Sequence, residues 1–395
     1  MKTFFIILLF ISLTFDLQAY QWEKITGTLP TVSAQTMSAC GNEILGGFNY
    51  IYKSRDHGST WEKVDQREWH ILNFAVYGNK IYCCGYGDIL ISTDNGDTWN
   101  YLAQNLVQSN IFCVVESVGK IFAGTNDELW VSENNGSHWS KVDLGYSQIT
   151  VNSLFADSRY LIAGTSGGLF VSEDNGVTWD TNIACMKNLY VYCMKAKGNN
   201  IFLGEAGGVY KLTNVNGNWS TSLLTMPGYN VMQMAVSGSY VFAGTFSNGL
   251  FYSYDDGNTW LDLNTGLDYM NITGLAANSD YVFACCTQPM SGGWTYSLYR
   301  MPLSVLDVRE TNQPSGIEVF PNPANDILTV KMPVMANQTV SWSVANLLGT
   351  KIINGSKQLS NGGFIINVSG LNDGVYFLNV SNENINIQKK LVVIK

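Results

Sequence analysis

The sequence predicts an all-β chain: a seven-bladed β-propeller followed by a small β-sandwich. Two observations predict the propeller. A polar octapeptide ending in tryptophan returns at a nearly constant interval, and each interval contains short apolar segments of strand length. A period near 40 residues built from short strands is typical of β-propellers. A third observation separates the two parts, because the octapeptide is missing beyond residue 260 while alternating apolar segments continue to the end of the chain.

The octapeptide first occurs as Ser-Arg-Asp-His-Gly-Ser-Thr-Trp at residues 54–61, and four further copies keep its serine, glycine and tryptophan. A degenerate copy at residues 212–219 has leucine in place of the serine. The closing residues are 38, 40, 40, 40 and 41 positions apart, and they are Trp61, Trp99, Trp139, Trp179, Trp219 and Trp260. Trp22 lies 39 residues before the first of these. Seven units starting at tryptophan predict seven blades.

Each unit carries three further apolar segments after the strand that begins at its tryptophan. In the third unit they are Ile111–Val115, Lys120–Thr125 and Glu128–Ser132, and the next octapeptide follows directly. Three strands plus the tryptophan strand make one four-stranded antiparallel blade. When the units are counted from each tryptophan, Trp22 starts the outer strand of a blade. The other strands of that blade come from the last unit, which ends near Tyr296–Met301. Joining the two ends of the propeller in this way leaves no exposed sheet edge.

The octapeptide resembles the Asp-box, or BNR repeat, of sialidases, some glycoside hydrolases and plant photosystem-assembly propellers. In that family the box is a folding device on the rim. A short Asp side chain accepts backbone N–H bonds across a tight turn, Gly supplies a positive φ, and Trp packs between sheets. The third copy departs from the pattern, with Asn134 in place of Asp and His138 in place of Thr. The resemblance implies a structural role, neither catalytic nor metal-binding, for Asp56, Asp94, Asp174, Asp255, Trp61, Trp99, Trp139, Trp179 and Trp260.

The N-terminal residues 1–19 predict a secretory signal peptide. Lys2 precedes an apolar run from Phe4 to Phe15, and the sequence Leu17-Gln18-Ala19 suits cleavage after Ala19. This run is too short to span a bilayer, which takes about 20 residues. No cysteine lies at the cleavage point and no second long apolar segment follows, so we expect neither a lipid anchor nor a transmembrane segment. These features place the mature propeller, residues 20–304, outside the inner membrane.

The end of the chain predicts a separate domain. Residues 305–315 read as a linker, and residues 316–395 contain alternating strands with Asn/Gly turns. This region resembles the type A sorting domain of the Bacteroidetes type IX secretion system, through residues 319–324 (Val-Phe-Pro-Asn-Pro-Ala), 344–350, 371–378 and 389–395. The resemblance implies an immunoglobulin-like β-sandwich that an outer-membrane translocon binds. It also implies passage through the periplasm, and a mature protein that is secreted or displayed on the outer cell surface.

Composition excludes several classes of partner and cofactor. Charged residues make up 13% of the chain and the net charge is −9, which argues against a nucleic-acid partner, since that would require a basic face. All eight cysteines fall in the propeller, where both free buried thiols and disulfides stay possible. Zinc is disfavoured because no CxxC or histidine pair accompanies them. We expect no cofactor and no bound metal.

No catalytic residue can be assigned from the sequence. Only three histidines exist, and two of them, His57 and His138, lie inside octapeptides. A sialidase requires an arginine cluster and the Arg-Ile-Pro motif of its family, and this chain has five arginines and lacks the motif. Xyloglucan-cleaving relatives use two facing propellers, whereas this chain has one. Sialidase activity is therefore not expected.

The loops at one end of the predicted ring form the candidate site. They carry aromatic rings among carboxylates, which suits recognition of a carbohydrate or a protein. The candidate residues are Trp69, His70, Tyr86, Asp88, Glu128, Tyr146, Tyr190, Glu205, Tyr229, Tyr269 and Trp294. One alternative is that the tyrosines only cap the core. Another is a polysaccharide-active hydrolase or lyase, for which two carboxylates about 5 to 10 Å apart would be needed.

Overall fold

The computed structural model divides the chain into two compact units, Met1–Val305 and Leu306–Lys395. Each unit is described by itself. The residues that the structure describes are 22–26, 36–146, 148–180, 189–215, 218–224, 229–290, 293–307, 318–321, 324–331, 339–345, 351–359, 363–372, 374–381 and 386–393. The predicted signal peptide lies outside these ranges.

The first unit contains seven antiparallel sheets among its described residues, mostly of four strands that are consecutive in the chain. The first sheet consists of β2 (Thr36–Cys40), β3 (Glu43–Gly47), β4 (Ile51–Ser54) and β5 (Glu62–Lys63). The second consists of β6 (Ile71–Tyr77), β7 (Lys80–Gly85), β8 (Ile89–Ser92) and β9 (Asn100–Ala103). The third consists of β10 (Ile111–Ser117), β11 (Lys120–Thr125), β12 (Leu129–Ser132) and β13 (Ser140–Val142).

The remaining sheets of this unit follow the same pattern. They consist of β14 (Val151–Ala156), β15 (Leu161–Thr165) and β16 (Gly168–Ser172); β17 (Val191–Lys197), β18 (Asn200–Glu205), β19 (Gly208–Val215) and β20 (Asn218–Leu223); β21 (Val231–Ser237), β22 (Tyr240–Thr245), β23 (Leu250–Ser253) and β24 (Leu261–Asp262); and β25 (Asn271–Ala277), β26 (Tyr281–Met290), β27 (Gly293–Pro302) and β1 (Glu23–Lys24). The three-stranded sheet continues in an isolated bridge between Val171 and Asp180.

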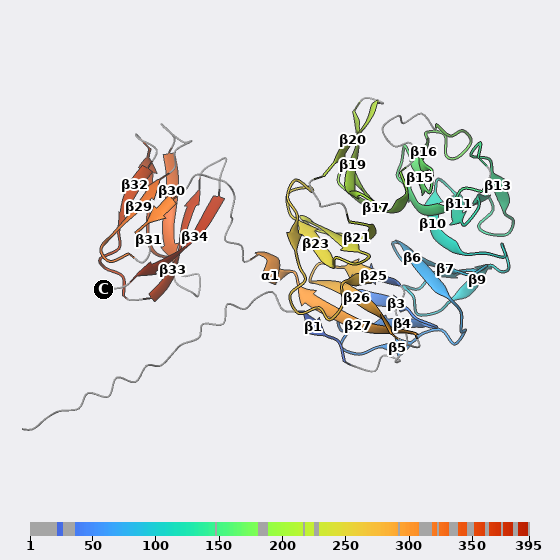
Figure 1. Ribbon diagram of the computed structural model, residues 1–395, viewed down its shortest axis with the longest axis horizontal. Coiled ribbons are helices and arrows are strands. Elements are labelled where there is room, and N and C mark those ends of the chain that lie inside the picture. The colour runs from blue at the N-terminus through green and yellow to red at the C-terminus, as the bar shows by residue number, and fades with distance from the viewer. Residues whose placement is uncertain are drawn as a thin grey trace, which may run out of the picture. The chain divides into compact units, whose positions relative to one another are not determined.

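The first strands of the seven sheets lie next to one another in a closed series. The series runs β2, β6, β10, β14, β17, β21 and β25, and β25 contacts β2 again. Figure 1 shows the sheets arranged around a common centre. Apolar second strands explain this packing, because β22 (Tyr-Val-Phe-Ala-Gly-Thr) is buried along its whole length between two neighbouring sheets. The hydrophobic cores of the unit accordingly lie between adjacent sheets, and both sheets contribute residues to the core between them.

The two ends of the unit meet in one sheet. Strand β1 pairs with β27 in the register Glu23↔Arg300, as the sequence repeat predicts for the strand after Trp22. The Trp22 indole N–H donates to the Leu263 carbonyl at 2.7 Å. Arg300 holds Glu23 through two hydrogen bonds, at 2.8 and 2.9 Å. Lys24 adds an ion pair with Asp268 on the same seam.

The degenerate octapeptide has a different structure from the others. Strands β19 and β20 continue through it as one long hairpin, with Asn214 paired to Trp219 and Val215 to Asn218. The residues at the tip, 216–217, lie outside the described ranges. This copy lacks the serine of the other copies, and its described residues are paired as β-strands.

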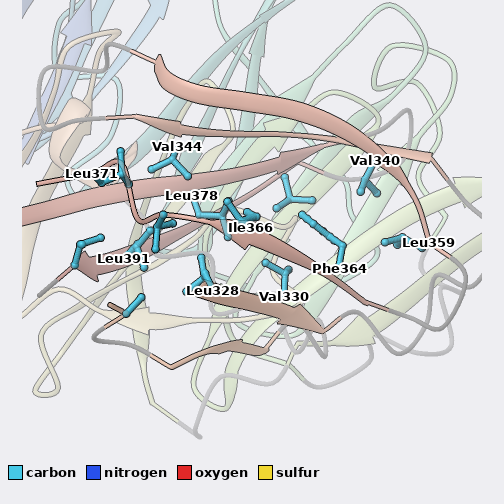
Figure 2. Packing of buried hydrophobic residues seen from close by; sticks show 14 residues of the cluster. Leu328, Val330, Val340, Val344, Leu359, Phe364, Ile366, Leu371, Leu378 and Leu391 are labelled. Atoms are coloured by element: carbon cyan, nitrogen blue, oxygen red, sulfur yellow. The ribbon is translucent and has the colours of Figure 1, made fainter. Parts of the chain in front are cut away.

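The second unit contains two sheets that enclose one core. They consist of β28 (Glu318–Phe320), β29 (Ile327–Lys331) and β32 (Gly363–Asn367), and of β30 (Thr339–Ala345), β31 (Lys351–Gln358), β33 (Gly374–Ser381) and β34 (Asn386–Val393). Figure 2 shows Leu328 and Val330 of the first sheet packed with Leu378 and Leu391 of the second. Alternate residues of β29, β30, β32, β33 and β34 point into this core, as expected for a sheet with one buried face.

The segment between the sheets of the two units begins with a helical turn. The sequence predicts a linker from residue 305, but α1 covers Ser304–Asp307, and the Leu306 side chain is fully buried. Residues 308–317, most of the predicted linker, lie outside the described ranges. No helix in the described part of the chain is long and apolar enough to cross a membrane.

Candidate functional site

The octapeptide turns lie at one end of the sheets, between the third and fourth strands. In the first copy the Asp56 carboxylate accepts the Thr60 N–H at 2.7 Å and the Thr60 hydroxyl at 2.7 Å, and the Ser54 hydroxyl donates to it at 2.9 Å. The Gly58 N–H donates in turn to the Ser54 hydroxyl oxygen at 2.7 Å. Both carboxylate oxygens are therefore occupied by the turn itself.

These hydrogen bonds favour the ionised form of the aspartates. The same set recurs at Asp94 and Asp174, where the threonine hydroxyl is the main cause that lowers the pKa of each carboxyl to about 2. At Asn134, in the third copy, the amide oxygen accepts the His138 N–H at 2.8 Å, so a neutral side chain closes the turn there.

Two successive residues in each turn have a positive φ. His57 and Gly58 have φ values of 56° and 85°, and the Ser59 N–H donates to the Asp56 carbonyl at 3.2 Å. A β-turn with two positive φ angles is the type I′ pattern, which favours Asn-Gly. The copies at Asn95-Gly96, Asn135-Gly136 and Asn175-Gly176 have this dipeptide. The sequence analysis accounted for the glycine and missed the residue before it.

The turn glycine also lies against the preceding sheet. A Cβ atom at Gly176 would lie 2.6 Å from Phe122 of β11, and one at Gly257 would lie 3.3 Å from Phe202 of β18. Trp61 and Trp99 are buried, and their indole N–H groups donate to the glycine carbonyl of their own turn at 2.9 and 3.1 Å. The turns therefore fasten one sheet to the next.

The opposite end of the sheets carries the exposed aromatic and apolar side chains. We call this end the upper face; it comprises the loops between second and third strands and the loops that enter each first strand. Its large apolar side chains with 38% to 60% of their surface exposed are Tyr86, Tyr146, Tyr190, Phe246 and Met270. They come from five different sheets. Met270 was not among the residues predicted from the sequence.

The three predicted carboxylates of the upper face have different environments. Asp88 accepts the Asn105 N–H at 2.7 Å, and Glu128 forms an ion pair with Lys141 of the neighbouring strand. Glu205 is 5% exposed and accepts the Gly207 N–H at 2.7 Å. The three residues lie in the sheets of β7, β11 and β18, so the fold distributes them over three sheets.

The other predicted residues have mixed positions. His70 is exposed, while Trp69 is half-buried and packs within the core that contains Cys83. Tyr229 is half-buried with its ring 5.4 Å from that of Phe251. Tyr269 is half-buried, and the side chain of Trp294 lies outside the described part.

A ring of β-bulges at the start of the first strands is a feature that sequence reasoning missed. In six of the seven first strands the pairing register shifts by one residue. The extra residues are Leu72, Phe112, Asn152, Tyr192, Met232 and Thr273. Bulges re-aim side chains and occur often beside functional sites. The only signal in the sequence is the constant distance of these residues from the apolar second strand.

Seven of the eight cysteines lie in the described part of the chain and form no disulfide there. Burial raises the pKa of Cys84 and Cys193 to about 12. The eighth, Cys185, lies outside the described residues. Among the residues described, no three His, Cys, Asp or Glu side chains gather as a group that could hold a metal ion.

Family models of known proteins match a part of each unit. The family model of a "Secretion system C-terminal sorting domain" matches residues 318–395, and that of a "DUF6242 beta propeller domain" matches residues 70–190. No curated protein matches the chain.

Solved structures extend the likeness over most of the first unit. The structure titled "YCF48 from Cyanidioschyzon merolae" is 18% identical with a TM-score of 0.53, covering 71% of this chain and 98% of that chain. The one titled "YCF48 bound to D1 peptide" is 18% identical with a TM-score of 0.52, covering 72% and 96%. At this identity the likeness shows the fold. The chain thus carries an all-β, propeller-like unit followed by a C-terminal sorting domain of the type IX secretion system.

Proposed function

We propose that the chain is an exported binding protein whose upper face recognises a polypeptide or a carbohydrate. The observation that carries this proposal is the set of exposed apolar side chains contributed to one face by five sheets, among them Tyr86, Tyr146 and Phe246. Single exposed apolar residues are ordinary, whereas several of them on one face are typical of an interaction site. Aromatic rings suit both apolar sugar faces and peptide side chains.

The proposal includes a finer description of the fold. We infer one blade from each sheet of the first unit, hence seven blades, and we assign the octapeptide turns to the Asp-box type. The closed series of first strands and the identical turn geometry of the five copies support this. For the second unit we propose an immunoglobulin-like sandwich, supported by two sheets around one core.

Binding is favoured over hydrolysis by the state of the carboxylates. Glycoside hydrolysis requires two of them flanking the scissile bond. On the upper face Asp88 caps a backbone amide and Glu128 is paired with Lys141, so both already have local partners. The structure titled as YCF48 with D1 peptide has a peptide ligand. A peptide is therefore included among the ligands proposed for this chain.

The sorting domain indicates export by type IX secretion to the cell surface or outside. We propose that the translocon binds residues 316–395 and that this unit is removed after export. Peptide mapping of the exported protein tests the proposal, since peptides from residues 36–302 are expected and peptides from beyond residue 316 are not. Recovery of intact 316–395 on the exported protein would contradict the removal.

The binding proposal can be tested with glycan and peptide arrays probed with residues 20–395. We expect a ligand that binds the wild type and is lost in the double variant Tyr86→Ser/Phe246→Ser. A matched control is Leu223→Ser, because Leu223 is as exposed but lies on the outer strand β20. Equal loss in the control would argue against an upper-face site. Release of reducing ends from a polysaccharide panel would contradict the proposal and favour the hydrolase.

A further inference from the structure

Glu205 occupies the last position of the second strand, where two other sheets have Gly47 and Gly85. The last residue of the second strand is Thr125, Thr165 or Thr245 in three other sheets. The Thr165 hydroxyl accepts the Gly167 N–H at 3.0 Å and donates to the Gly168 carbonyl at 2.8 Å. Glu205 occupies the corresponding place and accepts the Gly207 N–H at 2.7 Å. A threonine would close this turn, so the turn does not explain the carboxylate.

Glu205 is largely buried and has no counter-ion among the residues that the structure describes. Only 5% of the residue is exposed, and no Lys, Arg or His in the described part of the chain forms an ion pair with it. One of its oxygens accepts the Gly207 N–H, and the other has no hydrogen bond among the described residues. Removing a charge from water is costly unless that charge is paired. The described part of the chain supplies no cation to this carboxylate.

Two tyrosines flank the residue that pairs with Glu205. Val191 opposes Glu205 in the ladder, and Tyr190 and Tyr192 lie on either side of Val191. Tyr192 is the extra residue of the bulge, and its ring centroid lies 4.7 Å from that of Tyr190, at 37° between the planes. Tyr190 is partly exposed. Burial, then Tyr190 and Glu205, raise the pKa of Tyr192, which agrees with a shared, poorly hydrated environment.

We propose that Glu205, Tyr190 and Tyr192 form a site for the cationic side chain of a lysine or arginine in a polypeptide ligand. A carboxylate supplies the charge complement, and the faces of aromatic rings attract cations. The net charge of −9 adds attraction for a basic partner at longer range. This inference rests on the proposed binding function, and it names the chemistry that one sheet of the upper face recognises.

The test measures binding of fluorescein-labelled tetralysine to residues 20–395 by fluorescence anisotropy. Glu205→Thr keeps the acceptor for the turn that Thr165 provides, and we expect it to weaken binding about tenfold; Tyr190→Leu should weaken it severalfold. The controls are Asp127→Asn, an exposed carboxylate, and Tyr101→Leu, an exposed tyrosine of the fourth strand β9 in another sheet. Both should bind within about twofold of the wild type.

The outcomes distinguish binding at Glu205 from non-specific electrostatic attraction. They also distinguish the cation site from the wider proposal that the upper face binds a ligand. Unchanged binding by Glu205→Thr, or an equal loss in Asp127→Asn, would overturn the inference. Thermal unfolding provides a second readout, since Glu205→Thr should raise the Tm without peptide by removing an unpaired buried charge. A lower Tm would show that the carboxylate has a structural partner and would likewise contradict the site. If Glu205→Thr retained an array ligand that Tyr86→Ser/Phe246→Ser lost, the binding function would stand without the cation site.

Discussion

The two ends of the sheets in the first unit differ in how far their turns repeat from sheet to sheet. At the lower end, five copies of one octapeptide make the same turn, with the same serine, glycine and carboxylate or amide contacts. At the upper end the loops differ from sheet to sheet, and large apolar side chains are exposed. Repetition in sequence therefore marks the end that holds the sheets together, and variation marks the end that we propose as the binding face.

The difference also appears in how charged side chains are used. At the lower end Lys53 is 1% exposed, and its ammonium lies 2.7 Å from both Glu43 and Asp97, joining two sheets. At the upper end Glu128 and Lys141 pair within one sheet near the surface. We therefore expect equivalent substitutions to lower stability at the lower end and to have little effect on stability at the upper end.

The largest effect is expected at a buried octapeptide tryptophan. Trp99→Ala should lower the free energy of unfolding by about 3–5 kcal/mol, because a large buried ring and its bond to Gly96 are lost. Trp179 is half-buried and its indole N–H has no partner in the described part of the chain, so its substitution should cost less. Urea unfolding followed by tryptophan fluorescence and circular dichroism measures both. Equal costs would show that burial between sheets is not the cause.

A smaller loss is expected at the lysine that joins two sheets. Lys53→Met leaves Arg55 as the remaining cation shared by Glu43 and Asp97 and should cost about 2 kcal/mol, reduced from the fully buried case because both acids are partly exposed and keep this partner. The matched change at the upper end is Lys141→Met, whose exposed pair with Glu128 should be worth less than about 0.5 kcal/mol. Urea midpoints of the two variants compare the ends directly, and a larger cost at Lys141 would reverse the comparison.

The turn aspartates predict a dependence of stability on acid. Asp94 and Asp174 have a folded pKa of about 2, below the unfolded value of about 3.9. Their contribution is therefore complete above pH 4 and is lost as the pH falls toward 2. The double variant Asp94→Asn/Asp174→Asn, which copies the natural Asn134, should flatten this part of the profile. Urea midpoints at pH 5 and pH 2.5 measure it, and an unchanged slope would show that other carboxylates dominate.

The smallest effect is expected for an exposed tyrosine of the upper face. Tyr146→Ala should change the free energy of unfolding by no more than about 0.5 kcal/mol, because most of the ring is already in water. A cost above about 1 kcal/mol would mean that its edge contact with Phe170 supports the core, as in the capping alternative. Urea denaturation of this single variant is sufficient.

Periodicity made the architecture largely predictable. Spacing of the tryptophans predicted the strand order in the first unit and the pairing of residues 23–24 with β27, and four sequence blocks predicted the sorting domain that the family model finds. The helical turn at Ser304–Asp307 was missed because four residues carry too little periodicity to predict a helix. The sequence predicts a degenerate octapeptide at residues 212–219, whereas the described residues there pair as a hairpin. Pairing between two strands leaves no local signature in the sequence.

The site was less predictable than the fold. The sequence predicts a site of aromatic residues in the upper loops, and the structure shows that Tyr86, Tyr146 and Tyr190 are exposed. The burial of Glu205 and the extra position of Tyr192 could not be read from the sequence, because each depends on a one-residue shift between two paired strands. Ion pairs such as that of Lys141 with Glu128 likewise depend on which residues face one another across paired strands.

The seam between β1 and β27 has a consequence for the order of events during synthesis. Glu23 and Arg300 are 277 residues apart, and Arg300 also donates to the His57 carbonyl at 2.7 Å, so this one side chain joins the last strand to both the first strand and the first turn. Contacts of such separation form late, after intervening segments are in place. A nascent chain that has not yet produced residue 300 holds an incomplete ring with open strand edges, which are prone to pair with other chains.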